Sequence, residues 1–246
     1  MANDRQGAAI PAWLHGLLFV CFYLSGAAGL IYQIAWAKAL GLIFGTTTYA
    51  ITAVLGAFMG GLALGSWLLG RYVERTRDAL RLYGYVELGI AVAGAGSLAG
   101  LALIRYVSPA VANALGDHQI LMLGYRMVAT SLVLLVPTTL MGGTYPVILK
   151  LLAGNREQLG RYSSRLYYLN TAGAITGVLL AGFLLLWQLG LTRSVFVGAG
   201  LNVLVGLLVL AAAARVAPRR PQASCRRAPR RWGVGATRRV RHRATQ

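Results

Sequence analysis

Long apolar stretches alternate with short polar segments along the whole chain. Six of these stretches run for about 20 residues or more, the length that a helix needs to cross the apolar core of a bilayer. They span residues 14–34, 49–69, 82–104, 120–141, 166–189 and 195–214. Strands of a membrane β-barrel would instead show shorter segments of alternating hydrophobicity. The pattern therefore predicts an all-α fold, a polytopic integral membrane bundle of six transmembrane helices over residues 14–214.

The composition of the chain agrees with this pattern. Hydrophobic residues make up 57% of the 246 residues, charged residues make up 12%, and the mean hydropathy is +0.61. Soluble domains carry about 25% charged residues, so the shortage of charge indicates that lipid surrounds most of the chain. The first stretch follows Arg5 and has small residues at 25–29, as a signal peptide would, but it stays apolar to residue 34. We therefore expect an uncleaved first helix.

Positive charges divide unequally between the two sides of the predicted bundle. With six spans, the N-terminal segment 1–13, the loops after the second and fourth helices and the segment 215–246 share one side. Before residue 215 this side carries nine Lys or Arg residues and the other side carries three. The nine are Arg5, Arg71, Arg75, Arg77, Arg81, Lys150, Arg156, Arg161 and Arg165, and the three are Lys38, Arg105 and Arg193. Since cytoplasmic loops are enriched in Lys and Arg, we expect a protein of the plasma or inner membrane with both termini in the cytoplasm.

The second apolar stretch is rich in glycine and ends in arginines, as in LGAFMGGLALGSWLLGRYVERTRD. Small residues let helices approach closely in lipid, where the hydrophobic effect does little to hold helices together. Two glycine pairs spaced four residues apart, and a third in the fifth stretch, are therefore predicted to pack against other helices. The pairs are Gly56 with Gly60, Gly61 with Gly65, and Gly173 with Gly177. The alternative is that these glycines only reflect the general abundance of glycine in membrane helices.

Two ionisable residues, Glu87 and Arg126, lie inside the predicted spans, where charge is costly and often functional. With a rise of about 1.5 Å per residue, Glu87 lies about 8 Å from the cytoplasmic side, and Asn170 lies at a similar level. We expect these two residues, with Tyr85, to line a polar layer that binds a ligand. The alternative for Glu87 is a structural hydrogen bond to a neighbouring helix.

Arg126 lies about 9 Å from the opposite side by the same measure, too far from Glu87 for a direct ion pair. Gln33 lies at the level of Arg126, and Tyr32 and Asn202 are further candidates for this second polar layer. Alternatively, the Arg126 side chain snorkels to the headgroups, and the asparagines form hydrogen bonds between helices.

Motifs for soluble catalysis or metal binding are missing from the sequence. The two cysteines, Cys21 and Cys225, lie in the first apolar stretch and in the last segment, so we expect no disulfide between them. No Ser–His–acid grouping, phosphate loop or zinc spacing occurs. We therefore predict no catalytic residue, no metal and no cofactor.

The last segment, residues 215–246, holds 11 arginines and no acidic residue, and its three prolines prevent a long helix. We expect a disordered cytoplasmic tail, for which three explanations stay open. The tail adheres to anionic lipid headgroups, or it contacts nucleic acid with Trp232 stacking on bases, or it is the product of a truncation or frameshift in GC-rich DNA. Nucleic acid is not the partner that we expect.

Four segments, in order along the chain, carry a resemblance to a known family. They are YLSGAAGLIYQIAWAKALGLIFGTTTYA (23–50), AVLGAFMGGLALGSWLLGR (53–71), LMGGTYPVILK (140–150) and GRYSSRLYYLNTAGAITGVLLAGFLLL (160–186). Together they resemble the membrane portion of the fused major-facilitator/spermidine synthase family, and the resemblance covers residues 17–210. It implies a half-facilitator-like bundle. In that family a soluble aminopropyltransferase domain follows, which makes spermidine from putrescine and decarboxylated S-adenosylmethionine.

The chain departs from this family in two respects. Gln33 stands where family members tend to carry an acidic residue, and residues 215–246 show neither the strands nor the nucleoside-binding turn of the soluble domain. The resemblance therefore implies a noncatalytic membrane module linked to polyamine metabolism, with the lipid bilayer and a cytoplasmic aminopropyltransferase as partners. The alternative is a transporter or half-transporter for a small solute, a polyamine or another cation, that acts as a homodimer around a midplane site. A degenerate fragment without function is a third possibility.

Overall fold

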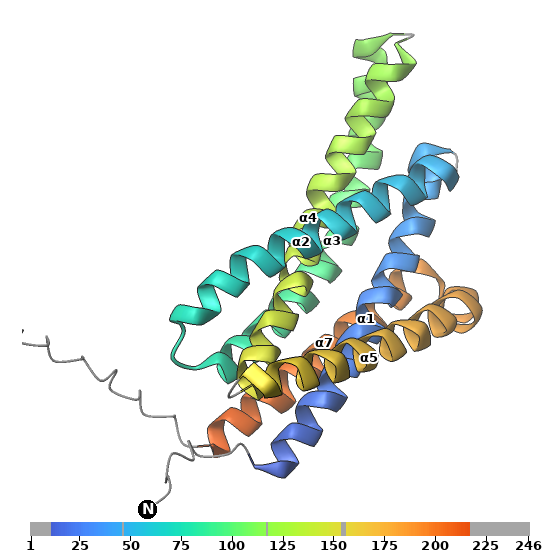
Figure 1. Cartoon of the computed structure of the whole chain (residues 1–246). Coiled ribbons are helices and arrows are strands. Elements are labelled where there is room, and N and C mark those ends of the chain that lie inside the picture. Colours follow the sequence, from blue (N-terminus) through green and yellow to red (C-terminus); the bar gives the residue numbers. More distant parts are fainter. Residues whose placement is uncertain (1–10, 46, 117, 154–155, 217–246) are drawn as a thin grey trace, which may run out of the picture.

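The computed structural model describes residues 11–45, 47–116, 118–153 and 156–216, and over these ranges the chain forms helices joined by short turns (Figure 1). The helices are α1 (Ala12–Phe44), α2 (Thr47–Arg75), α3 (Ala79–Leu115), α4 (Gln119–Leu152), α5 (Arg156–Leu179) and α7 (Gly190–Arg215). After α5 the same rod continues through a π-helical segment, η1 (Leu180–Leu185), and the short α6 (Leu186–Gln188). No strand occurs within these ranges. The predicted tail lies outside the described residues, apart from Arg215 and Val216.

Six of the helical rods are long and apolar enough to cross a membrane, and the all-α prediction is confirmed. Each rod is longer than the apolar stretch that predicted it, because the helix continues beyond the stretch at one end or at both ends. The extreme case is α3, whose 37 residues span about 55 Å at 1.5 Å per residue. Two prolines inside α4, Pro137 and Pro146, do not end that helix, which continues to Leu152.

Five of the helices form a closed ring, and α5 lies outside it. α2 packs on α4, α4 on α3, α3 on α7, α7 on α1, and α1 returns to α2. α5 packs mainly along α1. Helix α1 therefore has partners on three sides, and it supplies half of the largest fully buried side chains.

The helix ends gather at two ends of the bundle. The beginning of α1 and the end of α7 lie at the same end, as an even number of spans requires (Figure 1). At this end Asp78 caps α3: its carboxylate accepts a hydrogen bond from the backbone N–H of Arg81 and forms an ion pair with the Arg81 side chain. At the opposite end the tight turns after α1 and before α7 use Gly45 and Gly190, whose φ angles of 73° and 74° favour glycine.

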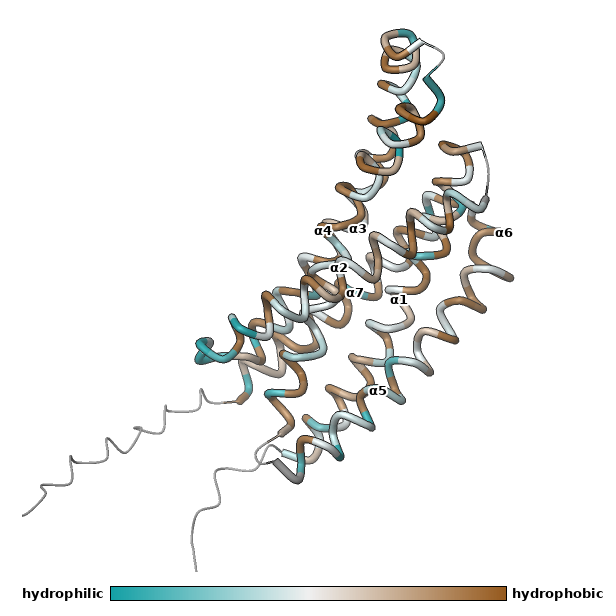
Figure 2. The backbone as a smooth tube through the Cα atoms, turned by 45° about the horizontal axis from the view of Figure 1, so that its top comes forward, coloured by the Kyte–Doolittle hydropathy of each residue, from teal (hydrophilic) through white to brown (hydrophobic). Residues whose placement is uncertain are grey.

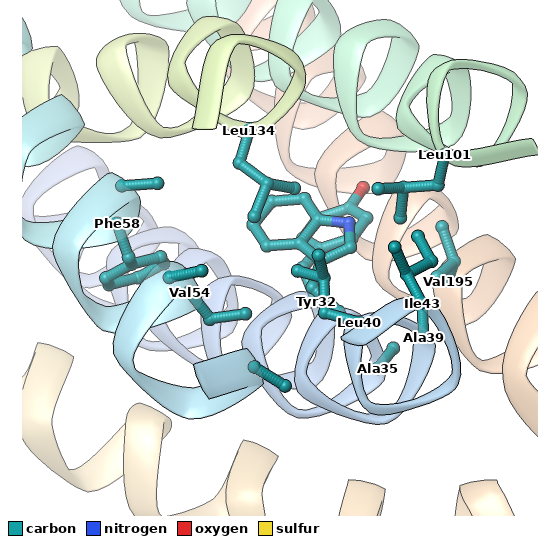
Figure 3. Packing of buried hydrophobic residues seen from close by; sticks show 14 of the residues in the cluster. Tyr32, Ala35, Ala39, Leu40, Ile43, Val54, Phe58, Leu101, Leu134 and Val195 are labelled. Carbon is teal, nitrogen blue, oxygen red and sulfur yellow. The ribbon is translucent and has the colours of Figure 1, made fainter. Parts of the chain in front are cut away.

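Aromatic side chains of α1 occupy the centre of the core. Tyr32 and Trp36 are fully buried and stack with ring centroids 5.4 Å apart. The Trp36 indole Nε1–H donates a hydrogen bond of 2.8 Å to the Ser97 hydroxyl of α3. Tyr32 and Trp36 belong to one apolar cluster. Figure 3 shows apolar side chains from other helices around Tyr32, among them Val54, Phe58, Leu101, Leu134 and Val195.

The outer faces of the rods are also apolar, as the hydropathy colouring of Figure 2 shows. Phe183 and Trp187 are more than 80% exposed, and large apolar residues are exposed on every long helix. Water would oppose so much exposed apolar surface, whereas lipid would solvate it. The surface thus fits the membrane environment that the apolar stretches predict.

Helices α3 and α4 rise together beyond the ends of the other rods (Figures 1 and 2). Their tip lies at the end of the bundle opposite to the beginning of α1. The hairpin is held by packing between α3 and α4 themselves.

Candidate functional site

Close helix packing marks one of the two glycine pairs on α2. A Cβ atom added to Gly61 would collide with the Thr138 side chain, and one added to Gly65 would collide with the backbone carbonyl of Thr139. Gly142 of α4 lies equally close to the backbone of Leu62. These glycines therefore let the backbones of α2 and α4 touch, as expected for a small-residue contact.

The other α2 pair, Gly56 and Gly60, has open space around both residues. A Cβ atom at either position would meet nothing within 4 Å in the described chain. The predicted packing of this pair is therefore not made within a single copy. Spacing alone could not distinguish the two pairs, because adjacent ridges of one helix face different neighbours.

The α5 pair lies against α1. A Cβ atom at Gly173 would collide with the Tyr23 carbonyl oxygen, and one at Gly177 would collide with the Ala27 carbonyl oxygen. The Tyr23 hydroxyl also lies 2.6 Å from the hydroxyl of Thr176, next to Gly177. These contacts hold α5 against α1.

Glu87 is fully buried between α3 and α7, and its partner is not the expected one. The Asn202 amide Nδ2 donates a hydrogen bond of 2.7 Å to Oε2 of Glu87. The placing of Asn202 in the layer of Arg126 is therefore wrong, whereas the prediction that Asn170 shares a polar layer with Glu87 stays a prediction. Tyr85, the third expected member of this layer, is 62% exposed and faces outward.

The mistake about Asn202 has a geometric cause. The sequence placed the beginning of the last span at residue 195, whereas α7 begins at Gly190. Asn202 is therefore 12 residues, about 18 Å, from the outer end of its helix. At this depth it can reach Glu87 of α3, since α3 and α7 pack along each other.

Several polar atoms around Glu87 have no partner. The hydroxyl groups of Tyr83 and Ser25 lie beside the carboxyl group. Within the described residues, however, Oε1 of Glu87, Oδ1 of Asn202 and the Tyr83 hydroxyl lack a hydrogen bond, although all three atoms are buried. Buried polar atoms without partners are uncommon and costly.

The second predicted layer does not form a hydrogen-bonded group in the described chain. Arg126 is partly buried on α4 and its Nε has no partner, and no hydrogen bond joins it to Gln33. Tyr32 belongs to the aromatic core, where its ring lies against Gly94 and Gly198. The ligand-binding roles of Arg126 and Gln33 stay predictions.

A pocket of about 210 Å³ lies between α1, α2, α4 and α5, and Asn170 lines it. Its polar residues are Ser25, Ser66, Thr144, Tyr145 and Asn170, set among apolar side chains such as Phe22, Phe58 and Met141. The Ser66 and Thr144 hydroxyls donate to the backbone carbonyls of Gly142 and Met141. The Asn170 carboxamide has no such bond among the described residues, so it is available to a ligand.

Ser25 belongs to both features. It lines the pocket, and it also lies beside the Glu87 carboxyl group. The buried Glu87–Asn202 pair is thus separated from the pocket by the width of one small side chain. The sequence did not indicate this role, because a serine in an apolar helix carries no distinctive signal.

Groups of three or more His, Cys, Asp or Glu side chains that could hold a metal ion do not occur over the described ranges. Cys21 is a free, buried thiol in α1. What the arrangement offers chemically is therefore one buried carboxyl group, a carboxamide bonded to it, and a small pocket with mixed polar and apolar walls.

Comparison with known proteins gives a distant similarity. The chain is 26% identical over 190 residues to a polyamine aminopropyltransferase of Leptospira interrogans (strain Fiocruz L1-130). The aligned region covers 77% of this chain and 34% of that protein, so the chain spans about a third of the length of its curated relative. No protein-family model and no solved structure matches. The chain is thus an all-α bundle of apolar helices that is distantly similar to part of a polyamine aminopropyltransferase.

Proposed function

We propose that this chain is a multi-pass membrane module, noncatalytic by itself, that serves a polyamine aminopropyltransferase. The observation that carries the proposal is the similarity over 190 residues to about a third of such an enzyme, in a chain whose described part consists of apolar helices. This combination supports a membrane portion that holds an enzyme at the bilayer, whether as part of the same polypeptide or as a separate protein. It also agrees with the resemblance to the membrane portion of the fused major-facilitator/spermidine synthase family.

The distribution of acidic groups supports the noncatalytic part of the proposal. Aminopropyl transfer to an amine requires a base that accepts a proton from the attacking nitrogen, and a polyamine site needs carboxylates for the ammonium groups. Glu74 is exposed at the end of α2, Asp78 is engaged by Arg81, and Glu87 is buried. These three described acids lie in different surroundings and do not form one site.

The orientation of the bundle completes the proposal. The positive-inside rule places the beginning of α1 and the end of α7 in the cytoplasm. At the same end α2 finishes with Arg71 and Arg75, and α4 finishes with Lys150. An aminopropyltransferase would therefore meet a basic surface on the cytoplasmic side of the plasma membrane.

Flotation of vesicles tests this function. Purified chain is reconstituted in liposomes and mixed with the soluble polyamine aminopropyltransferase of the same source, and the fraction of enzyme that floats with the vesicles is measured. We expect co-flotation with chain-containing vesicles, loss after Arg75→Glu with Arg77→Glu, and no loss after the matched reversals Arg105→Glu with Arg193→Glu on the other side. Spermidine formation by the chain alone, or flotation that is equal with empty vesicles, would contradict the proposal.

A second candidate function is transport of a small amine, and the pocket favours it. Polar groups from α1, α2, α4 and α5 converge on about 210 Å³ of space, and the Asn170 carboxamide is free there. One copy has the helices of half a facilitator, so two copies would enclose a shared path. The open ridge of Gly56 and Gly60 on α2 offers a close-packing surface for the second copy.

Uptake of labelled putrescine and spermidine by proteoliposomes tests transport. We expect saturable uptake that is lost in Asn170→Ala but retained in the matched control Asn113→Ala, because Asn113 is exposed near the tip of α3. The variant Glu87→Gln separates a role of the pocket from a role of the buried carboxyl group. The absence of uptake above empty liposomes, with folded protein, would reject this second function and leave the first unaffected.

A further inference from the structure

Glu87 is a buried acid without a counter-charge. Its side chain is fully buried in α3, and the ion pair formed within the described ranges joins Arg81 to Asp78 at the helix end instead. A buried carboxylate without a positive partner carries the full desolvation penalty of an ion, which no opposite charge offsets. The bundle interior therefore opposes a negative charge at this position.

The groups that face Glu87 do not supply the missing charge. From α1 the ionisable neighbours are Cys21 and Tyr32, and from α3 the neighbour is Tyr83. From α7 the partner is the neutral carboxamide of Asn202. A thiol and two phenols are neutral or negative, so none of them stabilises a carboxylate by opposite charge.

The hydrogen bonding of the Glu87–Asn202 pair leaves the Asn202 carbonyl oxygen without a donor. Asn202 Nδ2–H donates to Oε2 of Glu87, and the hydroxyl groups of Ser25 and Tyr83 lie beside the carboxyl group, but within the described residues no donor is bonded to Oδ1 of Asn202. A proton on Oε1 supplies the donor that Oδ1 lacks. The carboxylic acid and the carboxamide then form a ring of two hydrogen bonds, with the acid accepting from Nδ2–H and donating to Oδ1. Exchanging Oδ1 and Nδ2 of Asn202 by a rotation of the carboxamide would not supply the missing donor to a charged Glu87, because it would place Oδ1 against a carboxylate oxygen.

We propose that Glu87 and Asn202 form a buried proton-binding site between α3 and α7, in which the O–H of the neutral Glu87 carboxyl group donates a hydrogen bond to the Asn202 carbonyl oxygen. The proton comes from water and is bound at Oε1; no other bond forms or breaks. Ser25 lies between this site and the pocket, so its hydroxyl provides the route by which the proton reaches solvent. The inference concerns a ligand that neither proposed function assigns, and it holds for a docking module and for a transporter alike.

Infrared difference spectroscopy of the full chain in nanodiscs tests the site. The carbonyl stretch of a protonated carboxyl group is separate from that of a carboxylate, and it shifts in deuterated buffer. The chain contains six acidic residues, of which Glu87 is the one placed inside the apolar part of a span. We expect a protonated-carboxyl band at neutral pH that is lost completely in Glu87→Gln and retained in the matched control Glu74→Gln, since Glu74 is exposed.

A second variant examines the hydrogen-bonded ring. In Asn202→Ala the acid loses the acceptor for its proton, so the band should persist but move to the higher frequency of a weakly bonded carboxyl group. Glu87→Gln keeps the shape and the two hydrogen bonds of the neutral pair, and should therefore fold as the unchanged protein does.

Three results would overturn the proposal. The first is the absence of a protonated-carboxyl band at neutral pH in the unchanged, folded protein. The second is a band that disappears on addition of sodium ions at constant pH, because this would assign the site to a metal cation that competes for the carboxylate. A band that survives in Glu87→Gln would also exclude Glu87 as its source.

Discussion

The two glycine pairs of α2 allow a prediction in which one helix supplies both the test and its control. Gly65 touches the backbone of α4, at the carbonyl of Thr139 and the N–H of Gly143, whereas Gly60 faces open space. Replacing either glycine by alanine adds one methyl group and raises helix propensity by up to about 1 kcal/mol. At Gly65 the methyl group meets backbone atoms that cannot rotate away, so α2 and α4 must separate.

The expected magnitude follows from this difference. Overpacking of a tight contact costs about 1–3 kcal/mol, and the gain in helix propensity is shared by both variants and cancels in the comparison. Gly65→Ala should therefore be less stable than Gly60→Ala by about 1–3 kcal/mol, which corresponds to roughly 5- to 150-fold in the unfolding equilibrium. Compared with the unchanged protein, Gly60→Ala should be neutral or slightly stabilised.

Denaturation by SDS in mixed micelles, followed by far-ultraviolet circular dichroism, measures both free energies of unfolding in the same conditions. Equal stability of the two variants, with neither less stable than the unchanged protein, would refute the assignment of Gly65 to the α2–α4 contact. A loss at Gly60 as large as that at Gly65 would show that the open ridge is covered under the conditions of the measurement, and dilution of the protein would then reveal whether a second copy covers it.

Two further predictions concern the core and the open ridge. Ser97→Ala removes the acceptor of the buried Trp36 indole N–H. The free energy of unfolding should therefore fall by about 1–3 kcal/mol. Ser97→Thr keeps the hydroxyl group and should lose less stability in the same SDS titration. If two copies pack through α2, a single cysteine at Gly60 should form a disulfide-linked dimer in membranes when the native cysteines are replaced, whereas one at Val92, an exposed position on α3, should not. Equal cross-linking at both positions would indicate random collision instead of a defined interface.

The sequence could predict the helices, because an apolar window of sufficient length has few other structures open to it in lipid. It could not predict the helix ends, since hydropathy falls at the edge of the apolar core while the backbone hydrogen bonds continue. The first residue of α7 illustrates the consequence. The sequence predicted a beginning at Val195, five residues after the observed Gly190, and this error misplaced Asn202 by about 8 Å along the helix axis.

Pairing across the bundle was also beyond the sequence. Depth along a span tells how high a side chain lies, but not which way its helix is rotated, so the similar level of Asn170 could not show whether it faces Glu87. The structure separates them, with Asn202 bonded to the carboxyl group and Asn170 in the pocket beside Gly26. The sequence could single out Glu87 as an ionisable residue inside a span, whereas its partner Asn202 could be identified only from the packing of α3 on α7.

The length of the α3–α4 hairpin has a consequence for how the protein sits in a bilayer. To keep all of the 37 residues of α3 within a core of about 30 Å, the helix would have to tilt by about 57°, beyond the 0–40° that transmembrane helices adopt. The tip, with Tyr106 and Ile120 more than 80% exposed, must therefore stand in the headgroup layer or above it. An epitope or fluorophore inserted at the turn between these helices would be reachable from one side of the membrane without disturbing the bundle. A label on this hairpin would therefore report the membrane topology of the whole protein in intact cells.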